Sequence, residues 1–161
     1  MGSIEVIAYQ PEHQRYFEQF NRNWIEKYFV MEPVDEFVLT NPEEALLKPG
    51  GAILMASYNG EIAGTVALRK VDNGIYEFTK MAVDERFQRK GIAEALSYAS
   101  FEKAKELGAQ KVILYSNSQL KPAISLYEKL GFKHLPVGIG EYKRSDVKME
   151  ISVSATISVN H

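Results

Sequence analysis

The stretch Val83-Asp84-Glu85-Arg86-Phe87-Gln88-Arg89-Lys90-Gly91-Ile92-Ala93 carries the chain from a β-rich run into a helical one through a basic turn. A helix N-terminus offers unpaired N–H donors and the positive end of the helix dipole, and a glycine there lets a ligand approach the backbone. Arg86, Arg89 and Lys90 add positive charge that suits a pyrophosphate. The glycine spacing and the Lys-Ser/Thr pair of the P-loop and dinucleotide-binding motifs are missing. The turn predicts an anion-binding site, and an exposed helix start is the simpler alternative.

The residues before this turn predict a meander of three strands. The β-rich runs 52–58, 61–70 and 75–83 are separated by Asn59-Gly60 and Asp72-Asn73-Gly74. These turn sequences tolerate positive φ and favour tight antiparallel hairpins. We therefore expect three consecutive antiparallel strands.

The N-terminal part predicts a strand at 4–9 and then two helices. Aromatic residues recur at three- and four-residue spacing in the first helix, at Tyr16, Phe17, Phe20, Trp24 and Tyr28. Asn41-Pro42-Glu43-Glu44 has the pattern of an N-cap, a first-turn proline and a capping-box glutamate. It predicts a short second helix that ends at 49–51.

After the basic turn, a helical period returns and ends at Gly108, followed by a strand at 111–115. A further helix is expected from Pro122 to Gly131. Strands at 132–137 and 147–153 complete the order βααβββαβαββ. This order is typical of an α+β or mixed three-layer domain, and a length of 161 residues predicts one domain over 1–161.

Composition excludes several classes of protein. The formal charge of −2, from 19 Lys and Arg against 21 Asp and Glu, argues against nucleic-acid binding. The absence of cysteine excludes disulfides, thiolate metal sites and cysteine nucleophiles, and three scattered histidines indicate no metal centre. No apolar run reaches the roughly 20 residues that cross a bilayer, and no signal-peptide pattern is present. We expect a cytoplasmic protein.

Two spaced motifs resemble those of the GNAT superfamily of acyl-CoA-dependent N-acyltransferases. Gln88-Arg89-Lys90-Gly91-Ile92-Ala93 matches the Q/R-x-x-G-x-G/A signature, and a strand ending in Met81-Ala82-Val83 precedes it. The segment 123–132, Ala-Ile-Ser-Leu-Tyr-Glu-Lys-Leu-Gly-Phe, looks like the A-x-x-L-Y-x-x-x-G-F element. With the element order, the resemblance covers roughly residues 4–151. It implies a mostly antiparallel central sheet, splayed between the strands ending at Val83 and near Tyr115 and flanked by helices.

The resemblance implies acetyl-CoA as the acyl donor, bound in that splay. The backbone of Met81 and Val83 would pair with the pantetheine amides, and N–H groups from Arg89 through Ala93 would hold the pyrophosphate. The implied set of cofactor-binding residues is Met81, Ala82, Val83, Gln88, Arg89, Lys90, Gly91, Ile92, Ala93, Asn117 and Ala123. The chain departs from the family at Leu120, where many members carry Asn. Whether Asn117 or Ser118 replaces that side chain stays open.

Two residues are candidates for acid and base. Tyr127 lies on the second motif, and a phenol stays protonated at neutral pH and can give its proton to a departing thiolate. The alternative is that Tyr127 only packs on the apolar face of its helix. Glu77 lies six residues before Val83, so strict alternation places it on the same side as Met81 and Val83. Histone-type members carry a base there; the alternative is an exposed glutamate beside a basic residue.

The acceptor pocket is expected between the first helices, as in similar proteins, at Tyr28, Phe29, Glu32 and Asp35. The two carboxylates there would attract a cationic amine, and solvated loop charges with a helix cap at Asp35 are the alternative. Arg144 is a candidate to hold an acceptor carboxylate through its planar fork. An exposed turn is the alternative for that residue.

The sequence thus predicts an N-acetyltransferase that acts on a primary amine by direct attack in a ternary complex. A cysteine-bound acyl intermediate is excluded because the chain has no cysteine. We expect a small-molecule or peptide amine as acceptor, no nucleic-acid or membrane partner, and a homodimer as a family-level possibility. The alternative function is a non-catalytic acyl-CoA-binding or sensing module.

Overall fold

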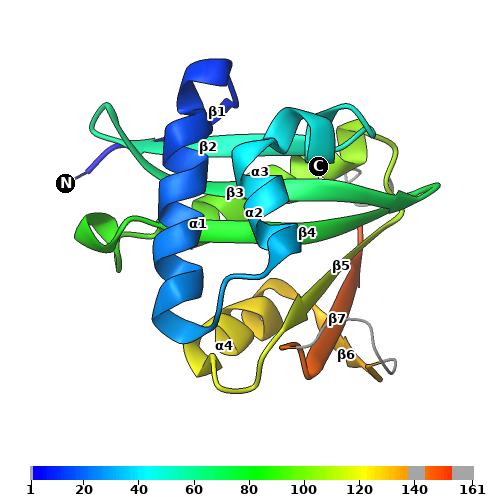
Figure 1. Cartoon of the computed structure of the whole chain (residues 1–161). Helices are drawn as coiled ribbons and strands as arrows, with labels where there is room; N and C mark the ends of the chain where they lie inside the picture. The colour runs from blue at the N-terminus through cyan, green and yellow to red at the C-terminus, as the bar shows by residue number, and fades with distance from the viewer. Residues whose placement is uncertain (1, 138–143, 154–161) are drawn as a thin grey trace.

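The structure is a computed structural model that describes residues 2–137 and 144–153 (Figure 1). Its elements in chain order are β1 (Ile4–Ala8), η1 (Pro11–His13), α1 (Gln14–Tyr28), α2 (Pro33–Thr40), η2 (Glu43–Leu47), β2 (Ala52–Tyr58), β3 (Glu61–Asp72), β4 (Ile75–Val83), η3 (Glu85–Phe87), α3 (Ile92–Glu106), β5 (Lys111–Ser116), α4 (Lys121–Leu130), β6 (Lys133–Leu135) and β7 (Val147–Ser152). No helix in the described ranges has both the length and the apolar character needed to cross a bilayer.

The strands form one sheet in the order β1-β2-β3-β4-β5-β7-β6. Every neighbouring pair is antiparallel except β4 and β5, which run parallel. The predicted hairpin between β2 and β3 is confirmed, because Asn59 and Gly60 both have positive φ, at 52° and 89°. The mixed, mostly antiparallel fold class is also confirmed.

The sheet opens between β4 and β5. Their pairing covers only Ile75–Glu77 against Lys111–Ile113, although β4 continues to Val83 and β5 to Ser116. The unpaired halves of two parallel strands therefore diverge, which confirms the splay that the family resemblance implies.

Helices cover both faces of the sheet (Figure 1). On one face, α1, α2 and η2 enclose a core that includes Phe17, Leu39 and Leu46. On the other, α3 packs on a larger core that includes Leu96 and Leu114. The side chains of all five are at most 1% exposed, and burying each contributes about 1.5–3 kcal/mol to folding.

The helix α2 differs from the sequence prediction, which left Pro33–Thr40 as a connection. Pro33 occupies the first turn of α2, and Glu32 with Asp35 forms a reciprocal capping box. Glutamate is not among the preferred N-cap residues, so the sequence lacked the usual start signal. The short helix predicted after Asn41 is present as η2, but the Asn41 side chain does not cap it: its amide donates to the Phe37 carbonyl and to Thr40 Oγ1 at the end of α2.

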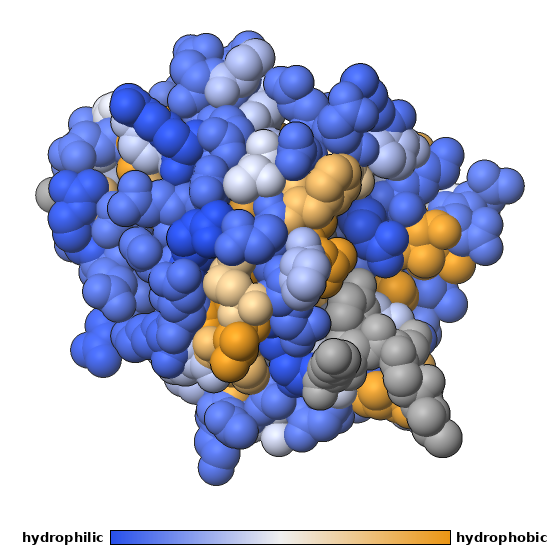
Figure 2. All heavy atoms as spheres, viewed as in Figure 1, coloured by the Kyte–Doolittle hydropathy of each residue, from blue (hydrophilic) through white to orange (hydrophobic). Residues whose placement is uncertain are grey.

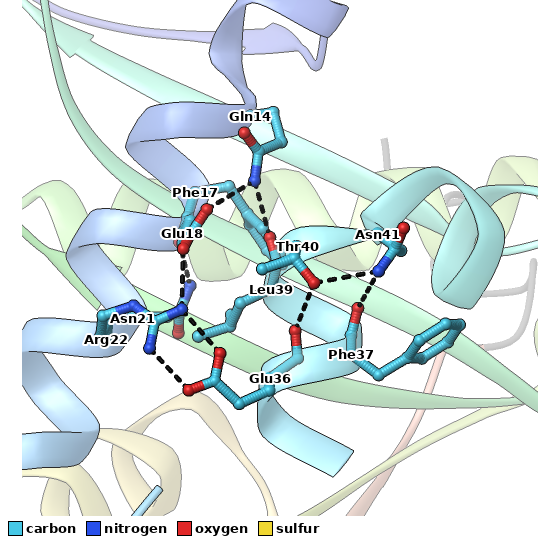
Figure 3. Close-up of polar contacts among 10 residues, drawn as sticks. All are labelled: Gln14, Phe17, Glu18, Asn21, Arg22, Glu36, Phe37, Leu39, Thr40 and Asn41. Carbon is cyan, nitrogen blue, oxygen red and sulfur yellow. Dashed lines mark hydrogen bonds and ion pairs between the residues drawn. The ribbon is translucent and has the colours of Figure 1, made fainter. Parts of the chain in front are cut away.

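Polar contacts attach α2 to α1 (Figure 3). Arg22 of α1 donates to both carboxylate oxygens of Glu36, at 2.8 and 2.9 Å. The Gln14 amide donates to the Leu39 carbonyl at 2.8 Å. The two helices are therefore held together by these contacts and form one wall beside the gap between β4 and β5.

Candidate active site

A cavity of about 350 Å³ lies where β4 and β5 diverge. Residues of α1, α2, β4, β5 and α4 line it together with the segment before β7. The structure brings nine of the predicted site residues to this cavity, namely Phe29, Glu32, Asp35, Glu77, Met81, Asn117, Ala123, Tyr127 and Arg144. The remaining predicted site residues do not line it.

A bulge in β4 shapes the wall of the cavity. Lys80 has a φ of +55°, and the register with β3 shifts between the pairs Thr65–Ala82 and Ala67–Thr79, so β4 contains one extra residue. The expectation that Glu77 shares a side with Met81 and Val83 is therefore wrong, because the extra residue reverses the alternation.

Contacts on the two faces show this reversal. Met81 and Val83 pack on the α3-side core, and Ser97 of α3 approaches the Met81 sulfur at 3.9 Å. Glu77 lies on the opposite face. It is paired with Arg69 of β3, which is two residues from Ala67 and on the same side of that strand, and Ala67 belongs to the core beneath α1.

Tyr127 lies in α4 against the divergent strands. Its ring packs edge-on against Phe78 and Phe132, with centroids 5.8 and 5.9 Å away. Burial raises the pKa of the Tyr127 hydroxyl to about 12. Tyr127 therefore both packs in the core and lines the cavity. Its hydroxyl keeps its proton at neutral pH.

Glu77 is almost completely buried, with 6% of its side chain exposed. Its Oε1 accepts hydrogen bonds from Nε and Nη2 of Arg69, both at 2.9 Å. The alternative of an exposed strand glutamate beside Lys80 or Arg69 is wrong about exposure, because Glu77 is buried at the cavity, and right about the neighbour, because Glu77 pairs with Arg69. The Arg69 side chain itself is 41% exposed.

Asp35 is the centre of a buried ion cluster, and 1% of its side chain is exposed. Arg144 donates to both oxygens, to Oδ1 at 2.7 Å and to Oδ2 at 3.0 Å. Lys80 Nζ lies 3.2 Å from Oδ1, and the Glu32 N–H lies 2.9 Å from Oδ2. Burial alone would raise the pKa of Asp35, but the hydrogen bonds from Arg144 and Glu32 and the charges of Lys80 and Arg144 outweigh it and lower that pKa.

These contacts correct two expectations about the acceptor pocket. Asp35 is not an open acidic residue waiting for an amine, because two cations already cover it. Arg144 does not offer a free fork to an acceptor carboxylate, because Asp35 occupies both of its terminal nitrogens, and Nη1 also donates to the Val30 carbonyl. Arg144 does lie at a turn, but only 25% of its side chain is exposed, so the alternative of an exposed turn is wrong about exposure.

Tyr28 and Glu32 also have roles that the sequence did not reveal. Tyr28 is 47% exposed and stacks on Trp24 outside the cavity lining. Trp24 itself lines the cavity, and its four-residue spacing from Phe20 and Tyr28 predicted only a buried helix face. The Glu32 side chain accepts the N–H of Asp35 at the start of α2.

The basic turn has the geometry of an anion-binding site, outside the cavity lining. Arg89 and Gly91 both have positive φ, at 64° and 87°, and Gly91 is the N-cap of α3 without a capping side chain. The first N–H groups of α3 therefore lack intrahelical partners, and alternating left-handed residues form a concave group of N–H donors. Arg86 is engaged elsewhere, with Asp84 at 3.0 Å and Glu61 at 3.6 Å.

Asn117 and Ser118 are both used within the protein. The Asn117 amide donates to the Arg144 carbonyl at 2.7 Å, and its oxygen accepts the Gln119 N–H at 2.8 Å. Ser118 Oγ donates to Asp146 at 2.7 Å. These contacts tie the end of β5 to the segment before β7. Among the described residues, no group of three His, Asp or Glu could hold a metal ion.

Comparison with known proteins places the chain in a family. The model of the Acetyltransferase (GNAT) family matches residues 8–132. The curated protein YjgM of Escherichia coli, described as an uncharacterized N-acetyltransferase, is 34% identical over 96 residues, which span 58% of each protein. The chain thus covers less than two thirds of the curated relatives that it matches.

Solved structures share the fold. A GNAT-family acetyltransferase of Staphylococcus aureus superposes with a TM-score of 0.82 at 21% identity, over 94% of this chain and 99% of that one. The PaiA N-acetyltransferase of Thermoplasma acidophilum, solved with coenzyme A, gives 0.73 at 20% identity, over 93% and 99%. With the family model matching most of its length, the chain belongs to the acetyltransferase (GNAT) family.

Proposed function

We propose that the protein is an acyl-CoA-dependent N-acetyltransferase that moves the acetyl group of acetyl-CoA to a primary amine. One observation carries this proposal: the splay between β4 and β5 holds a cavity that brings Glu77 and Tyr127 together. Family membership, the curated N-acetyltransferase relative and the coenzyme A complex of PaiA support the same activity.

The residues present fit the donor. The uncapped N-terminus of α3 at Gly91 supplies N–H groups for a pyrophosphate, and the open edge of β4 near Met81 supplies backbone groups for the pantetheine amides. Arg89 through Ala93 would hold the phosphates, while Ala123 lines the cavity beyond. Bound acetyl-CoA supplies the acetyl group as a thioester.

Glu77 is the proposed general base. An amine with a pKa near 10.4 is neutral in about one molecule in 2,500 at pH 7, which costs about 4.6 kcal/mol. The Glu77 carboxylate faces the cavity and can take the ammonium proton. The neutral nitrogen then attacks the acetyl carbon directly, a C–N bond forms, the C–S bond breaks and CoA leaves as the thiolate. The new amide nitrogen loses its second proton to solvent, which balances the charge of the thiolate. The Tyr127 hydroxyl is placed to donate to the leaving sulfur.

Replacing Glu77 with Gln should lower the rate at neutral pH, because the amide keeps the volume but takes no proton. Part of the loss should return as pH rises and the amine loses its proton unaided. The measurement is kcat/KM for one amine between about pH 6.5 and 9.5, a range that approaches the reference pKa of the amine.

The matched control is Arg69→Gln, which removes the same ion pair and keeps the carboxylate. The activity that Arg69→Gln loses should not recover in this way as pH rises. If Glu77→Gln loses activity by the same factor at every pH, Glu77 is a positioning residue and not the base.

The competing function is a module that binds acyl-CoA without turnover. An assay of CoA release and of the N-acetylated product, with acetyl-CoA and a panel of amines, separates the two. Stoichiometric product formation supports the enzyme, whereas acetyl-CoA binding without product from any amine supports the module. The single domain, the cytoplasmic location and the homodimer stay predictions.

A further inference from the structure

We infer that the acceptor is a primary amine whose remaining body is apolar and carries no second positive charge. This inference rests on the proposed function and names the class of substrate for the same cavity. It follows from the wall that α1 and α2 form and from the ion pairs that join five of the six charged residues in the lining.

The acceptor side of the cavity is apolar. Six hydrophobic residues of α1, α2, η2 and the segments between them line it: Trp24, Ile25, Phe29, Val34, Val38 and Leu46. Val34 is also 58% exposed, so the apolar surface continues from the cavity to the outside. Figure 2 shows hydrophobic side chains near the centre of this face, within mostly hydrophilic surroundings.

The charged groups of the lining balance. The Asp, Glu, Lys and Arg residues that line the cavity are Glu32, Asp35 and Glu77 against Arg69, Lys80 and Arg144. The Arg69–Glu77 pair and the cluster of Asp35 with Lys80 and Arg144 join five of the six directly. Glu32, the sixth, caps the start of α2. Such a cavity provides no excess negative charge to stabilise a dication.

The Asp35 carboxylate on α2 is closed to a ligand. Both Asp35 oxygens accept hydrogen bonds from cations, and its side chain is 1% exposed. Glu32 accepts the Asp35 N–H at the start of α2, where the helix dipole favours its charge. Glu77 is the group proposed to meet the reacting amine. A second ammonium would therefore lose its water without gaining a dedicated carboxylate, at a cost of several kcal/mol.

Pentylamine and pentane-1,5-diamine test this inference, because they share a carbon chain and differ by one ammonium. We expect kcat/KM to be at least about tenfold higher for pentylamine, since the loss of several kcal/mol exceeds a factor of ten. An equal or higher kcat/KM for the diamine overturns the inference.

The double variant Lys80→Met/Arg144→Met uncovers Asp35 by removing both covering cations. It should shift the ratio of the two kcat/KM values toward the diamine by about tenfold or more. The control is Arg22→Met, which removes a cation that pairs with Glu18 and Glu36 outside the lining. The ratio should stay unchanged in the control, and an unchanged ratio in a folded double variant contradicts the account. If the double variant does not fold, the ratio of kcat/KM for pentylamine and the diamine in the wild-type protein tests the inference on its own.

Binding separates this inference from the proposed function. Calorimetry of the wild-type protein saturated with CoA reports the affinity for each amine without turnover. Tighter binding of pentylamine supports the inference even if no amine is acetylated, an outcome that removes only the proposed function. Tighter or equal binding of the diamine, or no binding of either amine, overturns the inference.

Discussion

Tyr127→Phe is expected to lower kcat by about 10²- to 10³-fold while the affinity for acetyl-CoA stays nearly level. The substitution keeps the ring and its edge-on packing against Phe78 and Phe132. It removes only the hydroxyl, so folding should be little affected. Single-turnover and steady-state kinetics under conditions where chemistry limits the rate provide the measurement.

The raised pKa of Tyr127, about 12, sets the pH dependence of this effect. Because the pKa is raised, the hydroxyl stays protonated at every pH below about 11, and its ionisation should not limit activity there. Complete proton transfer to a thiolate with a pKa near 8.5 would be uphill by about 5 kcal/mol. The hydroxyl should therefore act chiefly as a hydrogen-bond donor to the developing charge on sulfur.

Tyr98→Phe on α3 is the matched control, because it removes the hydroxyl of an exposed tyrosine outside the cavity lining. Its kcat should remain at the wild-type value. A kcat close to wild type for Tyr127→Phe, with chemistry limiting, would assign Tyr127 to packing alone.

Asp35→Asn should lower the free energy of unfolding by about 3–5 kcal/mol, since it leaves two enclosed cations without their carboxylate. Arg144 and Lys80 both depend on that charge, and their side chains are 25% and 17% exposed. Denaturant unfolding at neutral pH measures the difference. The corresponding change Glu36→Gln, one residue along α2, should cost about 0–1 kcal/mol, because half of the Glu36 side chain is exposed to solvent.

The loss of unfolding free energy caused by Asp35→Asn should become smaller as the pH falls. The folded-state pKa of Asp35 lies below its ordinary value of 3.8, so the carboxylate contributes its stability above that value. The contribution is lost as pH falls through the lower, folded-state pKa. The gap between wild type and Asp35→Asn should be constant above about pH 5 and shrink in acid. Equal losses for Asp35→Asn and Glu36→Gln would contradict the buried cluster.

Local signals in the sequence predicted much of the fold. Asn59-Gly60 defines a hairpin because both residues tolerate left-handed backbone, and that hairpin is present. The glycine at 91 predicted a helix start suited to anions, and Gly91 is the left-handed N-cap of α3. Such features depend on a few neighbouring residues, so one sequence is enough to find them.

Features that depend on distant partners could not be predicted. The bulge at Lys80 exists in the pairing with β3, and no glycine or asparagine marks it. Arg144 and Asp35 are 109 residues apart in the chain. Each looked like an open ligand for the acceptor until the fold placed them on one another, which neutralises the acidic charge expected of the pocket.

The central claim is transfer of acetyl from acetyl-CoA to a primary amine in a ternary complex. The most direct measurement is the initial rate of N-acetyl product formation from pentylamine, with both substrates varied, together with the CoA released. The account predicts one CoA per acetylated amine and intersecting double-reciprocal lines, as direct attack requires. Parallel lines would indicate an acyl-enzyme, and CoA release without acetylated amine would show hydrolysis. Either result contradicts the account.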